Sequence, residues 1–219
     1  MIRLAVLLAL GLLAGCMQER SLPRYRGPMP ALSQPLAAQN LPTDLVRTEL
    51  AFQRTTRDSG IATALDRFAT GDAAFRGLTG GTRAGFLAAV GSAPQWSPHY
   101  VAMACDGSLG FSGGRIVAGA EVLEYASIWE RRGEEYRATL YALYDVLDGT
   151  KSADVRPDFV NTEIADCEGV VELAAGGAQG RSTDGTLGWQ LADGNLVVRI
   201  RQDGRDSVLF DQALTAGKR

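Results

Sequence analysis

The sequence contains few of the residues that bind metals or act as nucleophiles, with one histidine and three cysteines in 219 residues. This set is too small for a structural zinc site, and it disfavours a cysteine–histidine catalytic pair. Positive charge is not in excess either: 22 Lys and Arg residues stand against 25 Asp and Glu residues, for a net charge of −3. Such a surface offers no electrostatic footprint for a polyanion, so nucleic acid is not an expected partner. No motif implies a metal or another cofactor.

Long hydrophobic runs are missing as well. The apolar run over residues 4–13 is about ten residues long, whereas a membrane-spanning helix needs about 20. Apolar residues nevertheless make up 46% of the chain and recur along most of it. The composition therefore predicts one globular domain, or one domain with a small appendage, that buries a core of its own.

Residues 1–16 combine a positive charge, a short apolar run and a cysteine. Arg3 places a positive charge before the short apolar run, which is the size of a secretory signal. The run ends in Leu-Ala-Gly-Cys at residues 13–16, which resembles the lipobox. We expect residues 1–15 to be a signal peptide that is removed, and Cys16 to become an acylated N-terminus. The alternative is that Cys16 ends a leader without acylation or lies in a buried helix.

An acylated Cys16 would hold the chain to a membrane, because several acyl chains anchor a protein far more firmly than one. Met17 follows the cysteine, in place of the aspartate that resembles an inner-membrane retention signal. This favours the outer membrane, on its periplasmic side, with the inner membrane left open. Residues 16–42 carry five of the eight prolines and no apolar periodicity, so we expect an extended tether.

Helices are predicted first in the folded part, and strands follow. Thr43 can cap a helix that ends near Ser59, an apolar stripe indicates a second helix over 61–68, and a third begins at Thr82. Beyond Pro94 the apolar period changes to two. This predicts one hairpin over 99–104 and 109–117 and another over 122–132 and 136–146.

This order predicts an α+β fold over residues 43–148, with helices packed on a curved antiparallel sheet. Four segments carry a resemblance to a known family: Glu49–Phe52, Gln95–Pro98, Asp106–Gly114 and Tyr125–Arg131. Through them, residues 45–146 resemble the SnoaL-like branch of the nuclear-transport-factor-2-like (cystatin-like) superfamily. The resemblance implies a cone of sheet that is closed by helices and has a pocket at its wide end.

Residues 149–219 are predicted to form a C-terminal β-meander. Apolar residues alternate over 187–191 and 196–200, a last strand covers 208–210, and Asp-Gly pairs supply the turns between them. Residues 174–184 are rich in Gly, Ser and Thr and are expected to form a loop. A meander of three strands can bury one face only, so we expect it to pack on the main domain as one compact body.

Two cysteines remain if Cys16 is acylated. Cys105 and Cys167 are then an even number in an oxidising compartment, which favours a disulfide between them. The alternative is two separate buried thiols.

Candidate site residues follow from the resemblance, whose enzymes place an acid or histidine and tyrosines inside the cone. Asp145, Tyr141 and His99 are the candidate proton carriers, whereas Trp96, Trp129 and Tyr125 are expected to form core or pocket wall. None of the carriers repeats an enzyme motif residue by residue.

Two functions are therefore open. The preferred one is a non-catalytic envelope lipoprotein that binds a small apolar or amphipathic molecule or a protein partner, and the resemblance adds a homodimer through the open sheet face. The alternative is a SnoaL-like lyase, isomerase or cyclase that acts on a hydrophobic carbonyl compound.

Overall fold

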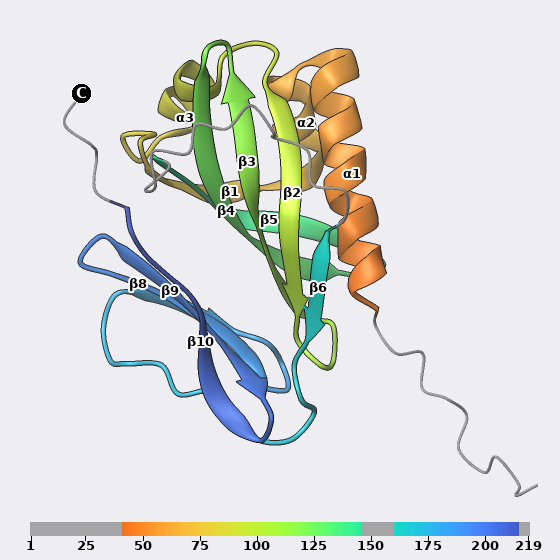
Figure 1. Cartoon of the computed structure of the whole chain (residues 1–219), viewed down its shortest axis with the longest axis vertical. Helices are drawn as coiled ribbons and strands as arrows, with labels where there is room; N and C mark the ends of the chain where they lie inside the picture. Colours follow the sequence, from red (N-terminus) through yellow and green to blue (C-terminus); the bar gives the residue numbers. More distant parts are fainter. Residues whose placement is uncertain (1–40, 146–159, 215–219) are drawn as a thin grey trace, which may run out of the picture. The chain divides into compact units, whose positions relative to one another are not determined.

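Three helices and ten strands make up the part of the chain that the computed structural model describes, residues 41–145 and 160–214 (Figure 1). All of these residues belong to one compact unit. The predicted leader, Cys16 and nearly all of the tether lie outside the described residues. Among the described residues, no helix is both long and apolar enough to cross a membrane.

The helices are α1 (Pro42–Ser59), α2 (Ile61–Phe68) and α3 (Arg83–Val90). The predicted cap of α1 at Thr43 is wrong: the helix begins at Pro42, and Leu41 is its N-cap. Proline suits the first helical position because the amide that it lacks would have no partner there. The predicted start of α3 at Thr82 is right to within one residue: Thr82 is the N-cap, and its hydroxyl accepts a hydrogen bond from the Gly85 amide at 3.0 Å.

The first sheet has six strands in the order β1-β5-β4-β3-β2-β6. Its strands are β1 (Ala69–Gly77), β2 (Gln95–Met103), β3 (Leu109–Ala118), β4 (Glu121–Arg132), β5 (Glu135–Asp145) and β6 (Asn161–Ile164). Both predicted hairpins are confirmed. The sheet is mixed, however, because β1 runs parallel to β5 and β6 runs parallel to β2. The expectation of a purely antiparallel sheet is therefore wrong, and β6, from the tail assigned to the meander, completes the main sheet.

The second sheet is an antiparallel meander in the order β10-β9-β8-β7. Its strands are β7 (Ala178–Arg181), β8 (Leu187–Ala192), β9 (Asn195–Gln202) and β10 (Arg205–Ala213). Three of these strands were predicted, but β7 lies inside the segment predicted as a loop. The Asp-Gly turns are present: Asp193 and Asp203 both have φ of 52°, the left-handed conformation that tight hairpin turns require.

Each face of the first sheet is covered by a different layer. The three helices pack on one face, where they form the larger apolar core with alternate residues of β2 to β5. The second sheet packs on the other face, where residues such as Leu196 and Val198 meet Phe111 and Ile128. The two-residue period of the strands thus separates two cores (Figure 1).

Candidate functional site

Glu49 lies fully buried on the helix-facing side of the first sheet. It belongs to the buried stripe of α1, between Leu45 and Phe52, so the helical period carries its carboxyl into an otherwise apolar core. A buried carboxyl needs hydrogen-bond partners, since it has lost the water that would solvate it.

Five donors surround the Glu49 carboxyl, and all of them come from the sheet. The indole of Trp129 donates to Oε1 at 3.1 Å, and the indole of Trp96 donates to Oε2 at 3.2 Å. Hydroxyl groups of Ser112 and Ser127 also donate to Oε1, and the Tyr125 hydroxyl lies 3.5 Å from Oε2. The three residues expected as pocket wall, Trp96, Tyr125 and Trp129, are therefore brought together around one carboxyl that the sequence reasoning missed.

Burial raises the pKa of Glu49 above its ordinary value, because desolvation outweighs the hydrogen bonds from Ser112, Trp96, Trp129 and Ser127. Each of the two indoles donates to a different carboxyl oxygen, and an indole can only donate. These donors favour the charged form of Glu49, whereas burial favours the protonated form, and the cluster ties α1 to three strands of the sheet. The aromatic side chains around it are themselves buried, so they fill the interior next to the carboxyl.

The three candidate proton carriers are not brought together. Tyr141 faces the helices, where it is fully buried, and its hydroxyl has no hydrogen-bond partner among the described residues. His99 lies at an irregularity in β2 and lines a groove that the second sheet borders. Asp145 is exposed at the end of β5. A role for these residues in proton transfer stays a prediction.

That groove lies between β10 and the sheet face that points away from the helices. Its volume is about 380 Å³, and it is lined by His99, Tyr100, Phe111, Gly113, Gly114, Arg115, Glu124, Tyr144, Leu209 and Phe210. The Phe210 ring lies 5.2 Å from that of Phe111 and 5.8 Å from that of Tyr144. The groove thus has an aromatic wall that takes residues from both sheets.

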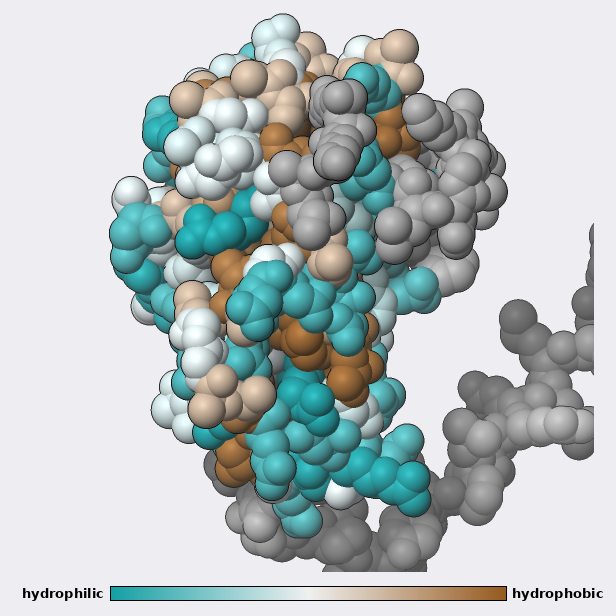
Figure 2. Space-filling model, turned by 90° about the vertical axis from the view of Figure 1, so that its left-hand side faces the viewer, coloured by the Kyte–Doolittle hydropathy of each residue, from teal (hydrophilic) through white to brown (hydrophobic). Residues whose placement is uncertain are grey.

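Charged groups lie together at one end of the groove. Arg115 and Glu124 are directly opposite on β3 and β4, with Arg115 Nε 3.6 Å from Glu124 Oε1, and Tyr144 is opposite Glu124 on β5. Burial, and secondarily the charge of Glu124, raise the pKa of the Tyr144 hydroxyl. The groove therefore combines an apolar wall with a paired cation and anion. On the face shown in Figure 2, hydrophobic residues likewise lie beside hydrophilic ones.

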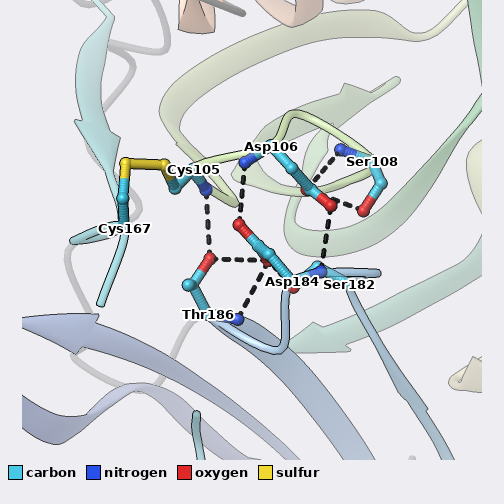
Figure 3. Close-up of a disulfide and its surroundings, with 7 residues drawn as sticks. All are labelled: Cys105, Asp106, Ser108, Cys167, Ser182, Asp184 and Thr186. Atoms are coloured by element: carbon cyan, nitrogen blue, oxygen red, sulfur yellow. Dashed lines mark hydrogen bonds between the residues drawn. A yellow bond between two sulfur atoms is a disulfide. The ribbon is translucent and has the colours of Figure 1, made fainter. Parts of the chain in front are cut away.

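The predicted disulfide is present between Cys105 and Cys167 (Figure 3). Cys105 lies in the turn between β2 and β3, Cys167 follows β6, and their Cα atoms are 5.1 Å apart. The bridge fixes the start of the C-terminal segment to the end of the first hairpin.

A reciprocal pair of aspartates lies beside the disulfide (Figure 3). The Asp106 amide donates to the Asp184 carboxylate at 2.8 Å, and the Asp184 amide donates to the Asp106 carboxylate at 3.0 Å. Each carboxylate also accepts the amide and hydroxyl of the residue two positions later, Ser108 in one turn and Thr186 in the other. Desolvation is the largest single influence on the pKa of Asp184 and raises it. The hydrogen bonds from Ser182, Thr186 and Asp106 together outweigh desolvation, so the pKa of Asp184 is lowered.

The two turns repeat one sequence pattern. Residues 106–111 read Asp-Gly-Ser-Leu-Gly-Phe and residues 184–189 read Asp-Gly-Thr-Leu-Gly-Trp. The glycines after the aspartates have φ of 68° and 76°, so both turns need glycine at this place. The carboxylates are satisfied by these amide and hydroxyl donors, and the turns form a structural joint between the sheets. Comparison of the chain with itself would have found this repeat.

Comparison of the chain with protein-family models, with curated proteins and with solved structures finds no match. Within residues 41–145 and 160–214, no three His, Cys, Asp or Glu side chains are grouped so that they could hold a metal ion.

Proposed function

We propose that this chain is a lipid-anchored protein of the bacterial cell envelope whose folded part binds a small apolar or amphipathic molecule without transforming it. The observation that carries the binding function is the groove between the sheets. It presents aromatic rings beside a paired cation and anion, whereas the opposite side of the first sheet is filled with aromatic side chains. We also propose a nuclear-transport-factor-2-like cone, which the order of helices and strands and the packing of all three helices on one face support.

The proposed anchor is an acylated Cys16 at the outer membrane, on the periplasmic side. The leader pattern of residues 1–16 supports it, and the disulfide is in keeping with an oxidising compartment. A homodimer remains part of the proposal. Because the second sheet packs on the face that the resemblance assigns to dimerisation, the contact would have to use another surface.

Mass spectrometry of the protein recovered from membranes tests both parts of this proposal. We expect an N-terminal Cys16 with acyl chains, and the Cys16→Ser variant should leave the membrane fraction. Native mass spectrometry of the wild type should show a bound small molecule. An intact leader on soluble cytoplasmic protein would overturn the anchor. If no small molecule, native or added, binds the purified protein, the binding function is wrong.

The second candidate is the SnoaL-like lyase, isomerase or cyclase, and Glu49 is the observation that favours it. A buried carboxyl with a raised pKa is a common acid or base in enzymes. Trp96, which donates to Glu49, also lines a cleft of about 340 Å³ with Gln53 and Gln95. Turnover of a hydrophobic carbonyl compound that Glu49→Gln abolishes and Asp145→Ala leaves unchanged would favour the enzyme with Glu49 as its base.

A further inference from the structure

We infer that the groove between the sheets takes a free, uncharged amphiphile, with an apolar chain along the aromatic wall and a hydroxyl-bearing head on the Arg115–Glu124 pair. This inference rests on the proposed binding function and specifies its ligand. It depends on three features of the groove: an open floor, an apolar wall, and a charge pair with no net charge.

The floor of the groove is open at Gly113. A Cβ atom on Gly113 would meet its nearest neighbour, the Tyr125 carbonyl oxygen, at 3.5 Å, which is an ordinary contact. On Gly114 it would lie 2.1 Å from the Ser97 carbonyl oxygen, so Gly114 is required for strand packing. Gly113 is not required for packing, and the absence of a side chain there leaves room above the strand.

The wall is apolar and extends from one sheet to the other. Phe111 belongs to β3, whereas Leu209 and Phe210 belong to β10. A hydrocarbon chain that displaces water from these side chains gains roughly 0.8 kcal/mol for each CH₂ group that it buries. The second sheet thus supplies two of the apolar side chains that a ligand would contact.

The head end selects by charge. The side chains of Arg115 and Glu124 are 22% and 26% exposed, so this ion pair is largely removed from water. A charged head would be attracted by one member and repelled by the other, and it would have to separate the pair at a cost in desolvation. A hydroxyl group can accept from the guanidinium and donate to the carboxylate while the pair stays intact.

Other polar groups at the groove do not change this balance. The Tyr100 hydroxyl donates a hydrogen bond to the Glu163 carboxylate, so this carboxylate already has a partner. The Tyr144 hydroxyl is uncharged near neutral pH, as tyrosines ordinarily are, and burial raises its pKa further. Because His99 also lines the groove, all compounds are compared at one fixed pH, pH 8.

The test compares three amphiphiles with the same chain: decanoate, decylamine and monodecanoylglycerol. Each displaces the neutral fluorescent probe N-phenyl-1-naphthylamine from the purified protein at pH 8, below the concentration at which it aggregates. We expect monodecanoylglycerol to bind about tenfold more tightly than either charged compound.

Two charge variants should change this order in opposite directions. Glu124→Gln leaves Arg115 without its anion, so decanoate should gain about tenfold in affinity, and Arg115→Gln should give the same gain to decylamine. Gly113→Val fills the floor and should remove binding of all three compounds. Gly71→Val is the matched control, since a Cβ atom on Gly71 meets nothing within 4 Å and the residue lies on β1, away from the groove. Circular dichroism verifies that each variant is folded.

The outcomes separate the ligand class from the binding function. If decanoate or decylamine binds the wild type best, or if folded Gly113→Val binds as the wild type does, the inference is wrong and the binding function stands. If Gly113→Val changes the oligomeric state, a second copy occupies the groove, which also overturns the inference. If neither the probe nor any amphiphile binds the wild type, the proposed binding function fails with it.

Discussion

Replacement of Glu49 tests the physical description of the buried cluster most directly. In Glu49→Gln, the amide oxygen can accept from the Trp96 indole while the amide nitrogen faces the Ser112 and Ser127 hydroxyls, which are able to accept. The Trp129 indole can still donate to the same two hydroxyl oxygens, which lie 2.9 Å (Ser112) and 3.1 Å (Ser127) from its nitrogen. We therefore expect a loss of about 1 kcal/mol in the free energy of unfolding.

Glu49→Ala should be far more destabilising. It leaves a cavity, and the Trp96 indole loses its carboxyl partner inside the core. A buried donor without its partner costs about 1–3 kcal/mol, and the cavity adds about 2–3 kcal/mol. The sum, about 3–6 kcal/mol, is a large part of the stability of an ordinary domain.

The pH dependence of the free energy of unfolding reports whether the pKa of Glu49 is raised or lowered in the folded state. Because the native pKa of Glu49 lies above the ordinary value of 4.5, the folded state binds its proton more tightly than the unfolded state does. This contribution to stability is fully present below pH 4.5 and is lost as the pH rises towards the native pKa, at up to about 1.4 kcal/mol per pH unit. The advantage of wild type over Glu49→Gln should therefore shrink as the pH rises.

Urea unfolding of wild type and Glu49→Gln across pH 4 to 9, with the disulfide intact, measures this difference. Glu134→Gln is the control, because Glu134 is an exposed glutamate in the β4–β5 turn. An advantage of wild type that stays constant or grows as the pH rises would refute the reasoning, since it would mean that hydrogen bonds outweigh desolvation.

Four further results are expected from the disulfide, the paired turns and the strands. Replacement of Cys105 and Cys167 by Ala should lower the free energy of unfolding by about 4 kcal/mol, because the bridge closes a loop of 62 residues. Calorimetry measures this loss, and a loss below about 1 kcal/mol would contradict the prediction. Asp184→Asn should cost about 1–2 kcal/mol at pH 7 and little in strong acid, because the native pKa is lowered and the stabilisation is lost as the pH falls through it. Asp106→Asn should couple to it, so that a double-mutant cycle in denaturant is not additive. Gly114→Ala should destabilise by about 1–3 kcal/mol through its clash with a neighbouring strand, and an unchanged thermal midpoint would exclude that clash.

The sequence predicts the elements whose burial follows a simple period. Strand β9 alternates along most of its length and β5 alternates in its first half, and the helical spacing of the buried residues of α2 is plain from Ile61 to Phe68. Strands β6 and β7 escape prediction because they are four residues long and largely exposed, so no apolar pattern distinguishes them from a loop. The parallel pairing of β1 with β5 and of β6 with β2 joins residues that are far apart in the chain, and local periodicity does not encode such contacts.

The candidate site is predicted only in part. Trp96, Tyr125 and Trp129 could be recognised as interior residues from their strands, and Cys105 and Cys167 as a pair from their number. Glu49 could not be recognised as their common partner, because a glutamate in a helix usually faces solvent. Its place in the buried stripe of α1 was the one available signal.

The disulfide and the paired turns join the two sheets at the end of β2 and β3. From there β3 becomes more accessible along its length, since residues 109–112 are buried and residues 113–115 are partly exposed. The joint therefore holds the two sheets together beside the buried end of β3, and the groove lies along the more accessible residues 113–115. The residues of the disulfide and of the paired turns do not line the groove, yet they hold together the two sheets that border it.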